Sequence, residues 1–428
     1  MGPVMARTRF TASIAAFLIA AFSFASSALA GPAASADDTA RFLAGLQPSA
    51  GSPLTVYTSE AFWKQHASAF DQAWDGLENR QLSKIRALVS KNFNDPKPLL
   101  FYLFSGPDFL YADAFFPSAD TYVMAGLEPP GQVPDLTKFS RAELADALRE
   151  LKTSLNSVLS YSFFQTKFMS YDLRKTRMPG TLPVIMVFLA RSGKTIYDVS
   201  LFDLASDGTI HPSEDKVANA TSKGVKIVFS DNVGKKKTIY YFSTDLSNKG
   251  IKSSGFPAFC DKLGNGDSFV KSASYLMHID DFSTVRDYLL AHSTALLQDD
   301  SGIPVRYLTQ GWKLHPFGKY VGPIGLFAGQ AQSQLHEIFG KGDANATPID
   351  FGIGYRWKPM ESNLLLAVKD NSVTALAAPS PKVGDVDAKP KKEAKVEKDD
   401  GKRAPHVLRR HRQQTVSNPD SKMFGYSQ

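Results

Sequence analysis

Apolar side chains recur every three or four residues between residues 58 and 93, which is the spacing of an amphipathic helix. Thr58 or Ser59 can cap its start, and Asp75-Gly76 predicts a break into two helices. The positions with this spacing are Phe62, His66, Phe70, Trp74 and Leu77, and the second helix carries Leu82, Ile85 and Leu88 on one side.

Continuous apolar runs replace this spacing after residue 98. "LLFYLF" (99–104) and "TYVMAGLEP" (121–129) each have the length and composition of a buried strand. Between them, Pro107 suits the first residue of a short helix. The sequence therefore predicts a βαβ-type unit near 99–129 with parallel strands, followed by a rigid loop.

A capping box formed by Ser140 and Glu143 predicts the start of a leucine-rich helix. The pattern then favours β-structure. "VIMVFLARSG" (184–193) and "TIYDVSLFDL" (195–204) are predicted as one pair of strands, and "VKIVF" and "KTIYYFS" as another. Antiparallel hairpins are expected near 182–245.

From residue 272 on, the sequence contains both helical spacing and strand-like apolar runs. A helix is expected from Asp281 or Ser283, and another around 330–339. Further strands are expected at 272–278, at 305–308 and near "DFGIGYRW" (350–357). The fold class is mixed α and β, in one large or two closely packed domains. These divide into a helical segment with the βαβ-like unit (58–135) and an α+β body (136–377).

The first thirty residues have the pattern of a signal peptide. Arg7 and Arg9 precede an apolar run of about a dozen residues and the small residues "SSALA", so cleavage is expected after Ala30. The run is shorter than the roughly 20 residues that span a bilayer. A periplasmic or extracellular location is expected, with 31–57 as a linker; an uncleaved anchor is the alternative.

The other end, 378–428, mixes Pro, Lys and acids and is predicted to be a disordered basic tail. It carries a net charge of +5 and residues 1–30 carry +2, so the whole-chain value of +7 leaves residues 31–377 neutral. A nucleic-acid binder is therefore not indicated. The tail either attracts an anionic envelope surface or only keeps the protein in solution.

Cys260 is the only cysteine, so no internal disulfide is expected and stability must come from the core. Its aromatic neighbours indicate a buried apolar side chain rather than a nucleophile.

No zinc, P-loop or Gly-x-Ser-x-Gly motif is present, and three segments remain as candidates for chemistry. The first contains Ser105 and Asp108 at the end of one predicted strand and Glu128 at the end of the next. In a parallel sheet such positions line the ligand crevice. The alternative is that Asp108 only stabilises the start of a helix.

The second segment is "HIDD". His278 with Asp280 or Asp281 could form a general-base pair, or bind a divalent metal with His315 or Asp299/Asp300 as a third ligand. The alternative is an ordinary strand end and helix cap. No motif supports a cofactor.

The third segment is "WKLHPFGKY" (312–320). Trp312, His315 and Tyr320 could form an aromatic platform for a glycan, or they could cover an edge of the core.

The chain also resembles a family of uncharacterised exported bacterial proteins. The resemblance rests on "FSGPDFLYADAFFP", "TYVMAGLEP", "LLQDDSGIP" and "WKLHPFGKYVGPI", and it extends over about residues 40–340. It implies export, but no activity and no site residue.

Two functions are compatible with these features. The first is a non-catalytic envelope protein that binds a glycan, peptide or protein partner. The second is a cofactor-independent or metal-assisted hydrolase of an envelope ester or glycan, with Ser105 as nucleophile, His278 as base and Asp108 or Asp281 as orienting acid. No transmembrane segment is expected in the mature chain.

Overall fold

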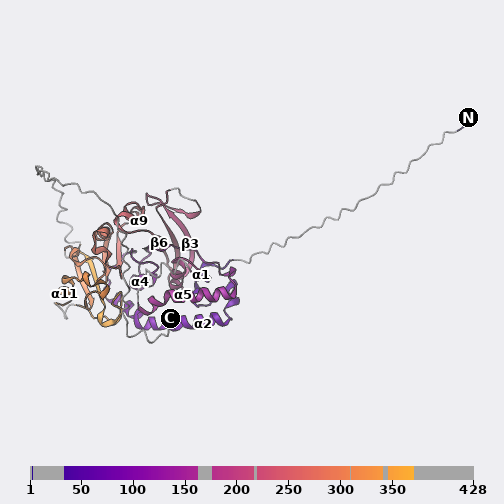
Figure 1. Cartoon of the computed structure of the whole chain (residues 1–428), viewed down its shortest axis with the longest axis horizontal. Helices are drawn as coiled ribbons and strands as arrows, with labels where there is room; N and C mark the ends of the chain where they lie inside the picture. The colour runs from indigo at the N-terminus through magenta and orange to yellow at the C-terminus, as the bar shows by residue number, and fades with distance from the viewer. Residues whose placement is uncertain are drawn as a thin grey trace, which may run out of the picture. The chain divides into compact units, whose positions relative to one another are not determined.

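One sheet runs through the part of the chain that the structure describes, and its strands come from both halves of the sequence (Figure 1). The structure is a computed structural model that describes Gly2 and residues 33–161, 176–215, 219–308, 310–340 and 346–370. The expected signal peptide, apart from Gly2, and the expected tail lie outside these residues. The described strands are β1 (Leu99–Tyr102), β2 (Thr121–Gly126), β3 (Thr195–Leu204), β4 (Ile210–Pro212), β5 (Ser222–Ser230), β6 (Lys236–Ser243), β7 (Gly266–Val270), β8 (Ser293–Gln298), β9 (Trp312–Gly318) and β10 (Asn363–Lys369).

The sheet has a parallel centre and antiparallel flanks. Its order is β4-β3-β5-β6-β2-β1-β7-β8-β10-β9. Strands β6, β2, β1, β7 and β8 are parallel to their neighbours within that group. All pairs outside it are antiparallel. The mixed α and β class is thereby confirmed, and so is the βαβ unit, in which Leu99 pairs with Thr121 and α4 (Phe109–Phe115) connects the strands.

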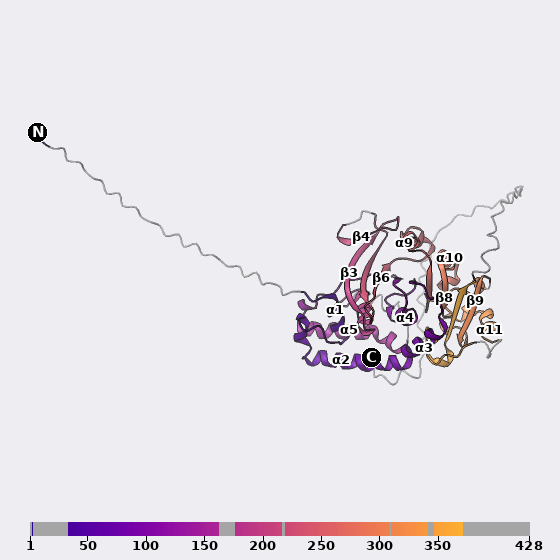
Figure 2. The ribbon, with the colours of Figure 1, turned by 180° about the vertical axis from the view of Figure 1, so that it is seen from behind.

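Helices cover both faces of the sheet (Figure 2). Alternating residues of β1 serve two cores: Leu100 and Tyr102 pack on one face, Leu99 and Phe101 on the other. The first face packs against α1 (Ala36–Leu43), α2 (Ala61–Leu77), α3 (Ser83–Asn92), α4, α5 (Arg141–Tyr161) and α7 (Leu182–Arg191). The second packs against α8 (Asn248–Lys252), α9 (Phe256–Leu263), α10 (Ser283–His292) and α11 (Ser333–Gly340).

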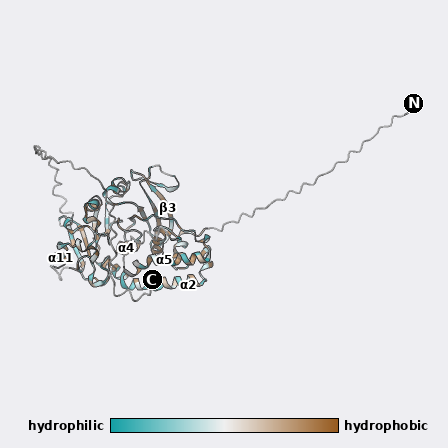
Figure 3. Cartoon of the chain, viewed as in Figure 1, coloured by the Kyte–Doolittle hydropathy of each residue, from teal (hydrophilic) through white to brown (hydrophobic). Residues whose placement is uncertain are grey.

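The long N-terminal helical segment shows why one predicted boundary was wrong. The helix does not break at Asp75-Gly76; a π-helical turn at Glu78–Leu82 joins α2 to α3. The turn presents the buried Gln81, whose amide oxygen accepts a hydrogen bond from the Tyr111 hydroxyl at 2.8 Å. Apolar and polar residues alternate along α2 (Figure 3). A tertiary contact therefore overrides the local signal of the glycine.

The capping box is confirmed: the Ser140 N–H donates to Glu143 Oε2 at 2.9 Å, and the Glu143 N–H donates to Ser140 Oγ at 3.3 Å. The expected strand at 184–193 is wrong, because Leu182–Arg191 forms α7. Leu182 to Ala190 are all buried, and a run that is apolar on every side does not distinguish a buried helix from a buried strand. The hairpins begin instead at β3.

Three other expected strands are also wrong. Residues 272–278 contain a left-handed turn and the 3₁₀ helix Leu276–His278, and Val305–Tyr307 is a 3₁₀ helix. The final strand is β10, after the segment 350–357. Short apolar segments next to Ser and Pro carried too little signal to separate a strand from a tight turn.

The range 31–57 is more than a linker, because α1 lies in it and buries Phe42 and Leu43 against the first face. Cys260 is buried and forms no disulfide. No helix in the described ranges is long and apolar enough to cross a membrane. All described residues fall within one compact unit, residues 1–376.

Candidate functional site

The carboxyl ends of β1 and β7 form the point at which the chain changes direction across the sheet. After β1 it continues to α4 on the first face, and after β7 it continues to α10 on the second. The two connections therefore diverge between neighbouring parallel strands. In open parallel sheets this topological switch point is where ligands bind.

A buried ion pair joins the two strand ends. The Lys271 ammonium lies 2.8 Å from Asp108 Oδ2, and each side chain is only 2% exposed. The Tyr102 hydroxyl also donates to Asp108 Oδ2 at 2.8 Å, and the Tyr111 N–H donates to Asp108 Oδ1 at 3.3 Å. The Lys271 ammonium lies 4.3 Å from the centre of the Tyr111 ring. Burial and the Asp108 charge raise the pKa of Tyr102 well above its usual value, so its hydroxyl remains a donor.

The segment that follows Lys271 has a strained backbone. Ser272, Ser274 and Tyr275 have φ angles of 54°, 53° and 55°, in the left-handed region that non-glycine residues rarely adopt. The Ser272 N–H donates to Asp299 at 2.9 Å, and the Tyr355 hydroxyl donates to the Ser272 carbonyl at 2.9 Å. Such strain persists where surrounding contacts enforce it, and it is concentrated at functional sites.

Two adjacent carboxyls at the end of β8 hold this segment in place. Asp299 Oδ1 accepts the Ser301 N–H at 3.0 Å, and Asp300 Oδ2 accepts the Tyr275 hydroxyl at 2.6 Å. Burial, together with the neighbouring Asp300 charge, raises the pKa of Asp299 to about 6. Burial also raises the pKa of Asp300. Because their hydrogen bonds go to the loop, both groups position the backbone.

A crevice opens beside this polar cluster; we call it the switch-point crevice. Its volume is about 160 Å³, and its wall is mostly apolar. It is lined by Leu103, Phe104, Gly106, Ala125, Gly126, Leu127, Glu128, Thr244, Asp245, Leu246, Ser272, Ala273, Ser274, Leu276 and Phe282. The buried Ser272 hydroxyl has no hydrogen-bond partner among the described residues.

Three predicted site residues, Asp108, Ser105 and Glu128, lie at this edge of the sheet. Asp108 caps α4, as the simpler interpretation held, and also pairs with Lys271. The Ser105 hydroxyl donates to the backbone carbonyls of Gly106 at 2.9 Å and Ala125 at 3.3 Å. Glu128 is 3% exposed and lines the crevice.

His278 lies near the cluster but not at a strand end. It ends a 3₁₀ helix, and its ring lies 5.1 Å from the Tyr275 ring. Burial and the nearby Arg306 charge lower the pKa of His278 to about 4. Asp281 is exposed and does not cap α10; the Asn248 side chain accepts the Thr284 N–H there at 2.8 Å.

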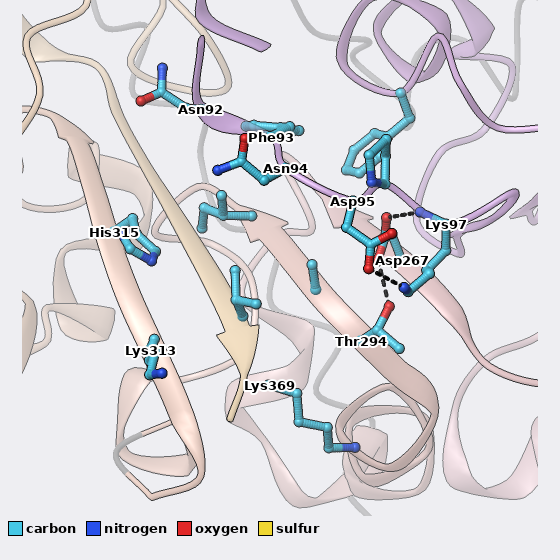
Figure 4. A pocket seen from close by; sticks show the side chains of 15 residues that line it. Asn92, Phe93, Asn94, Asp95, Lys97, Asp267, Thr294, Lys313, His315 and Lys369 are labelled. Carbon is cyan, nitrogen blue, oxygen red and sulfur yellow. Dashed lines mark hydrogen bonds and ion pairs between the residues drawn. The ribbon is translucent and has the colours of Figure 1, made fainter. Parts of the chain in front are cut away.

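The expected aromatic platform does not form one surface, because residues 312–318 are a strand whose side chains alternate between faces. Trp312 packs on the second core, and Tyr320 is buried there, 4.6 Å from the His336 ring. His315 lies on the first face, at a separate hollow of about 390 Å³ that we call the β9 hollow. Figure 4 shows His315 and Lys313 on β9, across this hollow from the hydrogen-bonded Asp267.

The sequence predicted neither Lys271 nor Ser272 as a site residue. For Lys271 a signal was available, because a lysine between a buried apolar run and small residues, "SFVKSAS", indicates a strand end with a buried charge. No group of three or more His, Cys, Asp or Glu side chains within the described ranges is arranged to hold a metal ion.

Comparisons of the chain with protein-family models, with curated proteins and with solved structures each find no match.

Proposed function

We propose that this chain is an exported cell-envelope protein whose switch-point crevice binds a small, mainly apolar ligand without converting it chemically. The observation that supports this most is the place of the crevice, at the topological switch point of a parallel sheet. Export is supported by the signal-like pattern of residues 1–30.

The lining indicates what kind of ligand fits. Leu127, Leu246 and Leu276 provide apolar wall, and the volume matches one ring or a short alkyl chain. A small polar part of the lining comes from Thr244, Asp245 and Ser272. A ligand with an apolar body and one polar group is therefore favoured, such as an acyl chain or an aromatic side chain of a peptide.

The hydrolase alternative has weaker support. Ser105 donates its proton to backbone carbonyls, so no base is in place to remove it. A histidine whose pKa is about 4 is a weak base at neutral pH. Two buried carboxyls beside the crevice, Asp108 and Asp299, are each engaged by several donors. The hydrogen bonds of the Ser105 hydroxyl go to backbone carbonyls rather than to Glu128, a carboxyl that lines the crevice.

The direct test is titration of the protein with two neutral probes, indole and 1-octanol, each with an apolar body and one polar group. Saturable binding is expected for the wild type. The variant Leu127→Glu should weaken it about tenfold or more, because a carboxylate then occupies the apolar wall. Leu127 is 67% exposed, so the fold should tolerate the change.

The matched control is Leu263→Glu, at the end of α9 and outside the crevice; Leu263 is 37% exposed. It should bind both probes like the wild type. Hydrolysis of envelope esters that Ser105→Ala abolishes would contradict the proposal and favour the alternative.

A further inference from the structure

Two loops beside the start of β10 carry exposed apolar side chains. One loop, residues 319–327, contributes Val321 and Leu326, which are 36% and 81% exposed. The other, residues 355–361, contributes Trp357 and Met360, at 38% and 78%. Exposing large apolar side chains together costs free energy in water, so such patches mark interaction sites.

Hydrogen bonds fix the two loops against each other. Arg356 donates from Nε to the Gly322 carbonyl at 3.0 Å and from Nη2 to the Pro323 carbonyl at 2.7 Å. The Lys319 N–H donates to the Ser362 carbonyl at 2.8 Å. The two loops that carry the four apolar side chains are therefore held together, and we call their exposed side the double-loop surface.

The charge on the double-loop surface is positive. Lys319 and Lys358 are exposed, and neither forms an ion pair with a described residue. The acid of the second loop, Glu361, is used internally, since Arg356 Nη1 lies 3.3 Å from its Oε2. The Lys358 ammonium lies 5.6 Å from the centre of the Trp357 ring.

We propose that the double-loop surface docks on the interface of an anionic lipid bilayer, with Leu326 and Met360 inserted between the headgroups. Apolar side chains flanked by Lys and Trp are the composition of membrane-interface segments. Protein interfaces are instead depleted of lysine at their centre. The net charge of +5 on residues 378–428 adds attraction to the same kind of lipid surface.

The test is sedimentation of the chain from Gly31 onward with vesicles of phosphatidylcholine alone or with a third of phosphatidylglycerol. Binding to the anionic vesicles is expected, with a part that persists at 0.5 M salt because it is apolar. The variant Leu326→Asp/Met360→Asp should reduce this salt-resistant part about tenfold or more. It should also reduce any blue shift of the tryptophan fluorescence on vesicle binding, because Trp357 lies on the same loop as Met360.

The control is Val233→Asp, in the β5–β6 turn, because Val233 is 88% exposed and lies far along the chain from both loops. It should bind vesicles like the wild type.

The proposal is overturned if the wild type does not bind, or if the double variant binds as well as the control. It is also overturned if sedimentation without vesicles shows a dimer that the double variant dissociates, since the surface would then be an interface between two copies. Indole binding in the switch-point crevice should be unchanged in the double variant.

Discussion

The switch-point crevice and the β9 hollow are both concave, but they hold charged groups differently. Beside the crevice, Asp108 and Lys271 are each 2% exposed and fixed by contacts from two strand ends. At the hollow, Lys313 is 66% exposed, and it lies 3.5 Å from Asp370 in a surface ion pair. The hollow also has a buried carboxyl, Asp267, which accepts hydrogen bonds but forms no ion pair with a described residue. The buried ion pair therefore lies where the connectivity of the sheet changes direction, and not at the larger concavity.

The largest expected effect follows from removing one partner of the buried pair. Lys271→Met leaves the Asp108 carboxylate buried without its counter-charge, so the free energy of unfolding should fall by about 3–5 kcal/mol. Urea unfolding at pH 7 measures this. The double variant Asp108→Asn/Lys271→Met should recover much of the loss.

A matched exposed pair sets the scale for that measurement. Lys84 lies 2.9 Å from Asp350, with side chains 35% and 75% exposed. Lys84→Ala should cost about 0–1 kcal/mol, because solvent screens such pairs. Equal losses for Lys271→Met and Lys84→Ala would show that the switch-point pair is no different from a surface pair.

The pH dependence of stability tests Asp299. Its pKa is about 6 in the folded protein, above the ordinary value, so the folded state binds the proton more tightly than the unfolded state. The stabilisation that Asp299 provides is present at low pH and is lost as pH rises through its folded pKa of about 6. The melting temperatures of the wild type and of Asp299→Asn should therefore converge or cross as pH rises. A difference in melting temperature that stays constant with pH would argue against a raised pKa of Asp299.

His278 offers a pH effect of opposite sign. Its pKa is lowered to about 4, so the folded state disfavours the charged ring, and stability is lost as pH falls from the ordinary value of 6.5 towards 4. Following the imidazole C–H resonances by NMR, with His278→Gln for assignment, measures the midpoint directly. A titration midpoint near 6.5 would mean that His278 can act as a base at neutral pH, as the hydrolase alternative requires.

The smallest effect is expected at the β9 hollow. Lys313→Ala removes an exposed cation, so stability should change by less than about 0.5 kcal/mol. Indole binding should be unchanged. A loss of indole binding in Lys313→Ala would move the site from the switch-point crevice to this hollow.

The sequence predicted the parts of the fold that rest on strong local signals. The capping box at Ser140, the βαβ unit and the β5–β6 hairpin each combine a cap or turn with a clear apolar pattern. The run at 184–193 failed because α7 is buried on all sides and has no polar face to reveal its period.

The site was predicted only in part, for a related reason. Asp108 and Glu128 could be placed because each directly follows an apolar run that proved to be a strand. The left-handed segment at Ser272 could not be foreseen, since its conformation is enforced by Asp299, Asp300 and Tyr355, which are distant in sequence. The aromatic platform failed because strand alternation separates Trp312 from His315.

Titration of indole into the wild type, Leu127→Glu and Leu263→Glu at the same pH and salt concentration decides whether the switch-point crevice is a ligand site. We expect saturable binding of indole to the wild type and to Leu263→Glu, and an affinity about tenfold or more lower for Leu127→Glu. Equal binding by all three proteins, or no saturable binding by the wild type, would contradict a ligand site in the switch-point crevice.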